Sequence, residues 1–149
     1  MPFKLNISDK GKAWKLESTS EIMVGKKIGE HLHGKDLLSD LEGYELEITG
    51  ASDNSGFPHK GDVEGPELKR VLLTKGWGMW KKPRKLGKKV VATPDGLRLR
   101  KTVRGKQLSE KTIQINLKVL KHGHKKLEEL FPEQNKPKEK KVEVAPAAA

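Results

Sequence analysis

The stretch Ile113-Gln114-Ile115-Asn116-Leu117-Lys118-Val119 decides the fold class, because apolar and polar residues alternate in it without a break. A period of two residues places successive side chains on opposite faces of a β-strand, one face buried and the other in water. This is the clearest strand signal of the chain, and Gly123 marks its end. The pattern therefore indicates a protein built mainly from β-strands.

Similar patterns recur along the chain and predict further short strands. They lie at Phe3–Ile7, at Trp14–Glu17 with the chain continuing to Ile22–Val24, at Tyr44–Thr49 and at Val71–Leu73. Thr93-Pro94-Asp95-Gly96 has the residue types of a tight turn, so we predict a hairpin that pairs Lys88–Val91 with Leu97–Arg100. Many short strands with glycine-rich turns predict a small antiparallel β-barrel of about six or more strands.

Length and composition predict a single domain with an appendage. The chain has 149 residues, too few for two full cores. Short amphipathic stretches at Lys35–Leu41 and Lys125–Phe131 predict one or two short helices. We assign residues 1–131 to the β-barrel body, including a basic hairpin at 81–106. Residues 132–149 are dominated by Pro, Lys, Glu and Ala, and we predict a disordered, flexible tail there.

The composition excludes several classes of protein and site. The chain has no cysteine, so disulfides and thiolate metal sites are excluded. No stretch approaches the roughly 20 apolar residues of a membrane-spanning helix. The first residues also lack the apolar run of a signal peptide. We therefore expect a cytoplasmic protein with no membrane partner.

The net charge of +11 is concentrated in one segment. Residues 81–106 contain eleven of the 31 Lys and Arg residues but only one of the 20 Asp and Glu residues, Asp95. The rest of the chain is therefore nearly neutral, and such a positive segment is typical of a polyanion-binding face. A membrane-surface or nuclear-import segment is the other interpretation. The membrane version favours an amphipathic helix, however, whereas this segment is predicted to be strand and turn.

Two tryptophans, Trp77 and Trp80, lead directly into the basic segment. An accessible tryptophan stacks on nucleic-acid bases, which contributes about 1–3 kcal/mol per base. The same residues would also serve as plugs at the mouth of a barrel, because aromatic side chains bury a large apolar area. The sequence leaves both interpretations open.

Enzyme chemistry is not indicated. Gly29–Asp36 nearly matches a phosphate-binding loop, but Asp36 replaces the hydroxyl residue that binds magnesium. The loop also does not lie between a strand and a helix of a parallel αβ sheet, as such loops do. The pairs His31/His33 and His122/His124 lack further ligands for a metal. No arrangement of nucleophile, histidine and acid is recognisable. We expect no enzymatic activity, no small-molecule substrate, no cofactor and no metal.

Five blocks of the sequence follow one another in the order of a known family's motifs. They are Phe3–Ser8, Ile48–Pro58, Arg70–Gly76, Arg100–Gly105 and Ile115–Gly123. Over residues 3 to about 123 the chain resembles the sixth small-subunit ribosomal protein of archaea and eukaryotes, the S-six-e family. The chain departs from the family pattern at Ala51, where a second glycine is usual, and at His59, where methionine is usual. The segment Val90–Gly96 resembles an insertion.

The resemblance implies a structural constituent of the small ribosomal subunit, with a β-barrel body on small-subunit ribosomal RNA and neighbouring ribosomal proteins as partners. The short chain, without a serine-bearing extension, resembles archaeal members. Charge placement alone also fits another function. A free-standing RNA-binding barrel in translation or RNA processing would carry the same basic segment.

The predicted RNA-binding residues are those that supply positive charge or a stacking surface around the basic segment, with the arginines as phosphate clamps. They are Lys60, Lys75, Trp77, Trp80, Lys81, Lys82, Arg84, Lys85, Lys88, Lys89, Arg98, Arg100, Lys101, Arg104 and Lys106. A second set is predicted to shape a loop that reaches the RNA or packs on the barrel. It consists of Gly50, Gly56, Phe57, Pro58 and Gly61.

Overall fold

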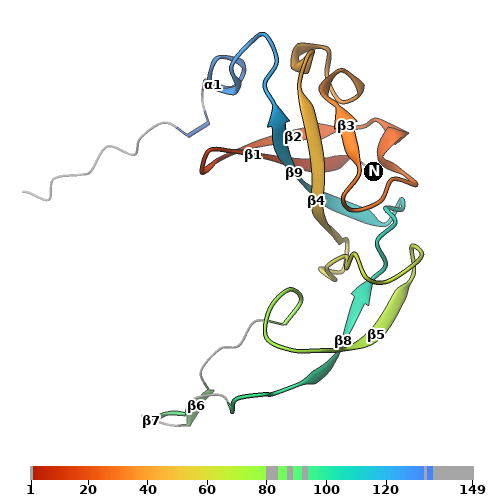
Figure 1. Ribbon diagram of the computed structural model, residues 1–149, viewed down its shortest axis with the longest axis vertical. Coiled ribbons are helices and arrows are strands. Elements are labelled where there is room, and N and C mark those ends of the chain that lie inside the picture. The colour runs from red at the N-terminus through yellow and green to blue at the C-terminus, as the bar shows by residue number, and fades with distance from the viewer. Residues whose placement is uncertain (1, 80–83, 87–88, 92–93, 133, 136–149) are drawn as a thin grey trace, which may run out of the picture.

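Five strands form the main sheet of the computed structural model, which describes residues 2–79, 84–86, 89–91, 94–132 and 134–135 (Figure 1). The strands are β1 (Phe3–Asp9), β2 (Lys12–Ser18), β3 (His31–His33), β4 (Glu45–Asp53) and β9 (Thr112–Lys121), in the sheet order β2-β1-β9-β4-β3. The alternating segments at Phe3–Ile7, Trp14–Glu17, Tyr44–Thr49 and Ile113–Val119 thus all contribute to this sheet.

β9 is the central strand and organises the sheet. It pairs in parallel with β1, where Leu5 lies opposite Ile115, and antiparallel with β4, where Ile48 lies opposite Leu117. All four side chains are fully buried, so the apolar half of each alternating strand faces one core. The polar half, which includes Gln114 and Asn116, lies on the opposite face of the sheet.

The β1–β2 hairpin shows how local sequence specifies a turn. Lys10 and Gly11 form its two-residue loop, since Asp9 lies opposite Lys12, and both loop residues have positive φ angles, 43° and 82°. Positive φ at both positions defines the turn type whose twist matches that of the flanking strands, and glycine adopts it without steric cost.

A separate two-stranded unit lies below the main sheet in Figure 1 and consists of β5 (Leu68–Leu73) and β8 (Leu99–Arg104). It has its own small core of Val63, Leu73, Met79 and Val103. A third antiparallel pair joins β6 (Arg84–Leu86) to β7 (Lys89–Val91).

The predicted hairpin across the turn at 93–96 is therefore wrong. The turn exists at Asp95 and Gly96, but Leu99–Arg104 pairs with the distant strand β5, and Lys89–Val91 pairs with β6. Burial explains the difference, because Val103 completes a core with Leu73 across the β5–β8 pair.

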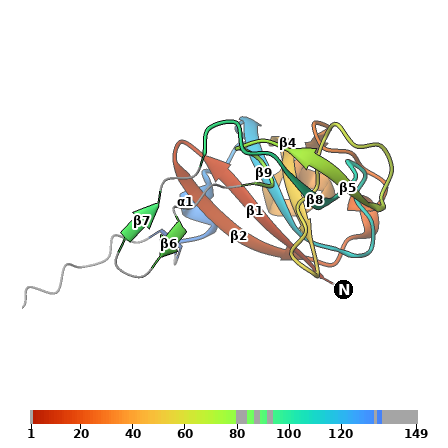
Figure 2. The same cartoon turned by 90° about the horizontal axis from the view of Figure 1, so that it is seen from below.

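The mainly β class is confirmed, but the described residues form no closed antiparallel barrel. The main sheet is mixed, because β1 and β9 run in parallel, and it is open, with β2 and β3 at its edges. β3 has only three residues, too short an edge to close a barrel. The β5–β8 unit pairs with itself instead of bridging the two edges. In the view from below in Figure 2, this unit lies in front of the main sheet.

Helical structure is sparse. Among the residues that the structure describes, the one α-helix is α1 (Leu127–Leu130), inside the predicted segment. Leu127 is buried, and Leu130 and Phe131 are partly buried against the main core. The one or two helical turns expected at Lys35–Leu41 are present as the 3-10 turns η2 (Gly34–Asp36) and η3 (Ser39–Leu41). A further 3-10 turn, η1 (Glu21–Met23), follows β2. Among the described residues, no helix is long and apolar enough to cross a membrane.

Two residues of the predicted tail are fastened to the sheet. The backbone N–H of Lys15 donates to Gln134 Oε1 (2.7 Å), and Gln134 Nε2 donates back to the Lys15 carbonyl (2.8 Å). Asn135 Nδ2 donates to the Ala13 carbonyl (2.9 Å). These amides occupy backbone groups on the open edge of β2, where another chain would otherwise pair. Residues 136–149 lie outside the described part.

We expect truncation to separate the two parts of the predicted tail. A chain ending at residue 135 should melt within about 1 °C of the full chain. A chain ending at residue 131 should melt roughly 2–4 °C lower, since it loses the bonds to the β2 edge. Thermal unfolding followed by circular dichroism measures both. Equal melting temperatures for the two truncations would show that Gln134 and Asn135 add nothing to stability.

Candidate nucleic-acid interface

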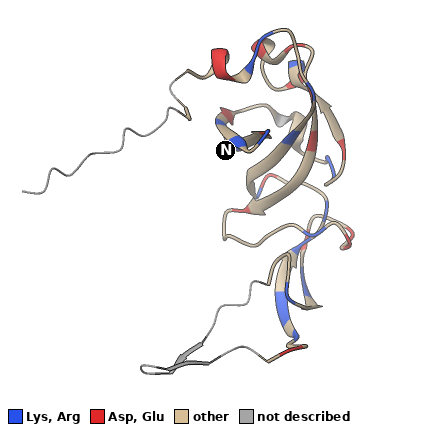
Figure 3. Cartoon of the chain, turned by 60° about the vertical axis from the view of Figure 1, so that its left-hand side comes forward, with Lys and Arg blue, Asp and Glu red and all other residues tan. Residues whose placement is uncertain are grey.

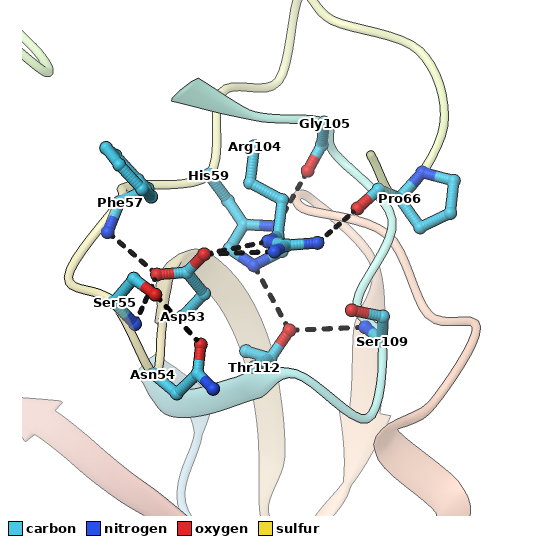
Figure 4. Close-up of polar contacts among 10 residues, drawn as sticks. All are labelled: Asp53, Asn54, Ser55, Phe57, His59, Pro66, Arg104, Gly105, Ser109 and Thr112. Atoms are coloured by element: carbon cyan, nitrogen blue, oxygen red, sulfur yellow. Dashed lines mark hydrogen bonds and ion pairs between the residues drawn. The ribbon is translucent and has the colours of Figure 1, made fainter. Parts of the chain in front are cut away.

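Asp53, the last residue of β4, shapes the loop that follows it. Its Oδ1 accepts hydrogen bonds from the backbone N–H groups of Ser55 (2.9 Å) and Phe57 (2.8 Å) (Figure 4). Gly56, between these two residues, has a φ of 81°, a conformation that side chains rarely adopt. The carboxylate thus folds the Gly-Phe-Pro segment into a tight turn at the end of the main sheet.

The other oxygen of Asp53 binds Arg104, the last residue of β8. Arg104 Nε and Nη2 donate to Oδ2 at 3.1 and 3.0 Å, and Arg104 Nη1 donates to the Pro66 carbonyl at 2.8 Å. Both side chains are buried, with 7% and 1% of their surface exposed for Arg104 and Asp53. Arg104 therefore joins the β5–β8 unit to the main sheet, and its position is not that of a surface phosphate clamp.

His59 forms the second half of this buried polar cluster. Its Nδ1 lies 2.6 Å from the Gly105 carbonyl and its Nε2 lies 3.1 Å from Thr112 Oγ1. A carbonyl only accepts, so Nδ1 carries the proton and Nε2 accepts from the threonine hydroxyl. Burial lowers the pKa of His59, and the nearby Arg104 guanidinium lowers it further, against the opposing effects of the Gly105 hydrogen bond and Asp53. The ring is neutral in this arrangement.

The outer face of the β5–β8 pair carries exposed cations. Residues opposite each other across the two strands point the same way, and the pairs Leu72/Arg100 and Arg70/Thr102 lie on the face away from the small core. Arg70 and Arg100 are exposed, and Arg98 precedes β8 in an exposed stretch. Figure 3 shows Lys and Arg gathered on this unit. Lys75 and Lys101 are also exposed.

Two predicted contact residues form ion pairs within the chain instead of standing alone. Lys60 Nζ lies 2.8 Å from Asp62 Oδ2, and Lys106 binds Glu64. The lysine hydrogen bonds lower the pKa values of Asp62 and Glu64, so these carboxylates remain charged at neutral pH. The pairs reduce the local positive potential, and Lys60 and Lys106 contribute less free charge than Arg98 or Arg100.

Trp77 lies at the junction of the two units. Its Nε1 donates to the His59 carbonyl (2.8 Å), and its ring lies on Gly50, where an added Cβ would meet Cη2 at 2.7 Å. Gly50 is thus a strand residue on which the indole packs. Gly61 lies in the loop with open space around its Cα. Pro58 pairs with Ser52 in an isolated bridge.

Several predicted residues fall where the structure says little or nothing. Trp80, Lys81, Lys82 and Lys88 lie outside the described residues. Arg84, Lys85 and Lys89 belong to β6 and β7, for which only the backbone is described. Arg70, on the outer face of β5, is an exposed cation that the predicted set did not include. The sequence contained the signal for this position, because strand periodicity places Arg70 on the face opposite to that of Val71 and Leu73.

The segment resembling a phosphate-binding loop has a different structure from such loops. Gly29–Asp36 contains edge strand β3 and the 3-10 turn η2, and a Cβ on Gly34 would collide with the Leu41 carbonyl at 2.1 Å. Within the described ranges, no three His, Asp or Glu side chains are grouped to hold a metal ion.

Comparison with known proteins gives consistent matches over most of the chain. A family profile described as "Ribosomal protein S6e" matches residues 3–132. The small ribosomal subunit protein eS6 of Methanocaldococcus jannaschii is 41% identical over 121 residues, which cover 81% of this chain and 82% of that protein. The eS6 protein of Methanothermobacter thermautotrophicus is 42% identical over 134 residues, or 88% and 96% of the two chains. That of Methanocella arvoryzae is 37% identical over 139 residues, or 90% and 89%.

Removing the Arg104 side chain should lower the free energy of unfolding far more than removing the side chain of a surface arginine. Arg104→Ala leaves Asp53 buried and unpaired, so we expect the free energy of unfolding to fall by about 3–5 kcal/mol. Arg100→Ala, on the exposed part of the same strand, is the matched control and should change it by about 0.5 kcal/mol or less. Urea unfolding measures both values. Equal effects of the two substitutions would refute the structural role of Arg104.

His59 should make stability depend on pH. Its pKa is lower in the folded chain than in the unfolded chain, where it is about 6.5, so unfolding takes up a proton in acid. The contribution of His59 to the free energy of unfolding is complete above about pH 6.5 and is lost as the pH falls toward the pKa of His59 in the folded chain. Between pH 7.5 and 5.5 the urea midpoint should therefore fall for the natural chain. His59→Gln should show a much flatter dependence, and an equally steep one would assign the effect to other groups.

Proposed function

Because the chain belongs to the ribosomal protein S6e family, and is thus a structural protein of the small ribosomal subunit and not an enzyme, we propose that it binds ribosomal RNA through the outer face of β5–β8. Family membership also places it in the cytoplasm and favours a fixed subunit component over a free-standing RNA-binding protein. The observation that carries the proposal is the pair of exposed arginines on this face, Arg70 and Arg100, together with the exposed Arg98 directly before β8.

The chemistry of these arginines suits a phosphate backbone. A guanidinium presents a planar fork of donors that matches phosphate oxygens, and each neutralised phosphate releases condensed counterions. Arg70 and Arg100 project from two antiparallel strands held in one register by six residue pairs, so their spacing is defined before RNA arrives. Arg104, the last residue of β8, joins the two strands to the main sheet and does not contact phosphate.

The loop from Asp53 to Gly61 is the second proposed contact. Asp53 preforms its tight turn, so the backbone around Gly56 is rigid and open, with nothing within 4 Å of a Cβ added there. Phe57 and Pro58 are partly buried, which supports packing of these side chains on the protein as well as contact with RNA. Neighbouring ribosomal proteins are proposed partners on the remaining surfaces.

We expect Arg98→Ala/Arg100→Ala to weaken binding to small-subunit ribosomal RNA and to flatten its salt dependence. The slope of log K against log salt concentration should fall in magnitude by up to about 2, because each lost phosphate contact accounts for about 0.9. Equilibrium binding of the full chain to RNA transcribed in vitro, at several salt concentrations, measures this.

Lys125→Ala/Lys126→Ala is the matched control. Both lysines are exposed and directly precede α1, far from β5–β8 in Figure 1. This variant removes the same number of charges, and its slope of log K against log salt concentration should equal that of the unsubstituted chain. If the two double variants flatten the slope equally, binding follows net charge and not the proposed face.

A further inference from the structure

Trp77 is an exposed aromatic ring that the fold holds in one position. The side chain is 47% exposed, which is unusual for a residue that buries so much apolar surface in a core. Its Nε1–H donates to the His59 carbonyl, and the Cζ2–Cη2 edge of the ring lies against Gly50. The orientation of the indole is therefore set by the protein, and its exposed surface is available for stacking.

A pocket of about 390 Å³ opens beside this ring, a size within the range of small-ligand sites. It lies where β4 and β9 of the main sheet meet the segment leading from β5. Its lining residues are Ala51, Ser52, Gly56, Pro58, Trp77, Gly78, Gln114 and Asn116. None of these carries a charge, so the pocket suits a neutral, partly apolar group.

The two amides of the pocket are arranged to present one donor and one acceptor. Asn116 Oδ1 accepts from Asn6 Nδ2 and from Gln114 Nε2, both at 3.1 Å, which orients both pocket amides. Within the described part of the chain, Asn116 Nδ2 and Gln114 Oε1 have no hydrogen-bond partner. Neighbouring donors and acceptors are what the edge of a nucleobase offers and requires.

We propose that this pocket binds a single unstacked base of RNA, with the base stacked on Trp77 and its edge on Gln114 and Asn116. The inference rests on the proposed RNA-binding function and adds a base-specific site to it. RNA is favoured over a protein segment because the neutral pocket lies beside the β5–β8 unit, whose opposite face carries exposed arginines. A neutral base and its charged phosphates require that same division.

Two substitutions test the pocket without changing charge. Trp77→Leu removes the stacking plane. Gly50→Ala keeps the tryptophan but places a Cβ 2.7 Å from its Cη2, so the ring must move. Gly50 does not have a positive φ, so alanine fits its backbone. Leu120→Ala, which truncates a side chain that is 40% exposed near the far end of β9, is the control. Thermal unfolding verifies that each variant is folded.

Binding of each full-length variant to small-subunit ribosomal RNA is measured across salt concentrations. We expect Trp77→Leu and Gly50→Ala to weaken binding about fivefold or more at every salt concentration, because stacking releases no counterions. The salt slope should match that of the natural chain, in contrast to Arg98→Ala/Arg100→Ala. Leu120→Ala should bind like the natural chain.

The outcomes separate the two proposals. If Trp77→Leu and Gly50→Ala bind RNA with natural affinity while Arg98→Ala/Arg100→Ala flattens the slope, the base pocket is refuted and the cationic face stands. If these pocket variants bind RNA normally but enter small subunits poorly, the occupant is a protein segment and the base assignment is refuted. If the natural chain binds RNA without salt dependence, the proposed cationic face itself fails.

Discussion

The buried ion pair between Asp53 and Arg104 is the constraint on which the arrangement of this protein depends. The carboxylate divides its two oxygens, one organising the loop after β4 and the other binding the guanidinium at the end of β8. Backbone bonds reinforce the junction, since Arg104 N–H donates to the Pro58 carbonyl and Lys60 N–H donates to that of Arg104. The Gly-Phe-Pro loop, the β5–β8 pair and the Trp77 indole therefore hold fixed positions relative to the main sheet.

Local sequence located most strands but did not pair them. It missed the short strands β3 and β6, and the expected continuation of the second strand at Ile22–Val24 overlaps the 3-10 turn η1. Alternation identified the segments at Phe3–Ile7 and Ile113–Val119, because burying one face of a strand requires that pattern. The turn residues at 93–96 marked a real turn, with Gly96 at a φ of 73°. They did not reveal that Leu99–Arg104 pairs with β5, since that choice depends on which apolar faces complete a shared core. The open, mixed sheet was missed for the same reason.

The charge of the candidate site was predictable from the sequence. Which of its arginines are exposed and which is buried was not predictable. Charge density identified the right segment, and Arg98 and Arg100 are exposed there. Arg104 shares the same residue type and strand periodicity, yet its partner Asp53 is 51 positions away along the chain. Only tertiary structure distinguishes a buried structural arginine from its exposed neighbours. The pocket of Trp77, Gln114 and Asn116 combines three segments that no local motif connects.

The parallel pairing of β1 with β9 affects how the chain folds during its synthesis. Leu5 and Ile115 are partners separated by 110 positions, so the central strand is synthesised long after β1. At roughly 5–20 residues per second, β1 is made about 5–20 seconds before its neighbour exists. During that interval the β1–β2 hairpin is a marginal structure with both of its edges unpaired. Folding of the sheet is therefore delayed until β9 has been synthesised, and the pairing of strands so distant in sequence makes it slow thereafter.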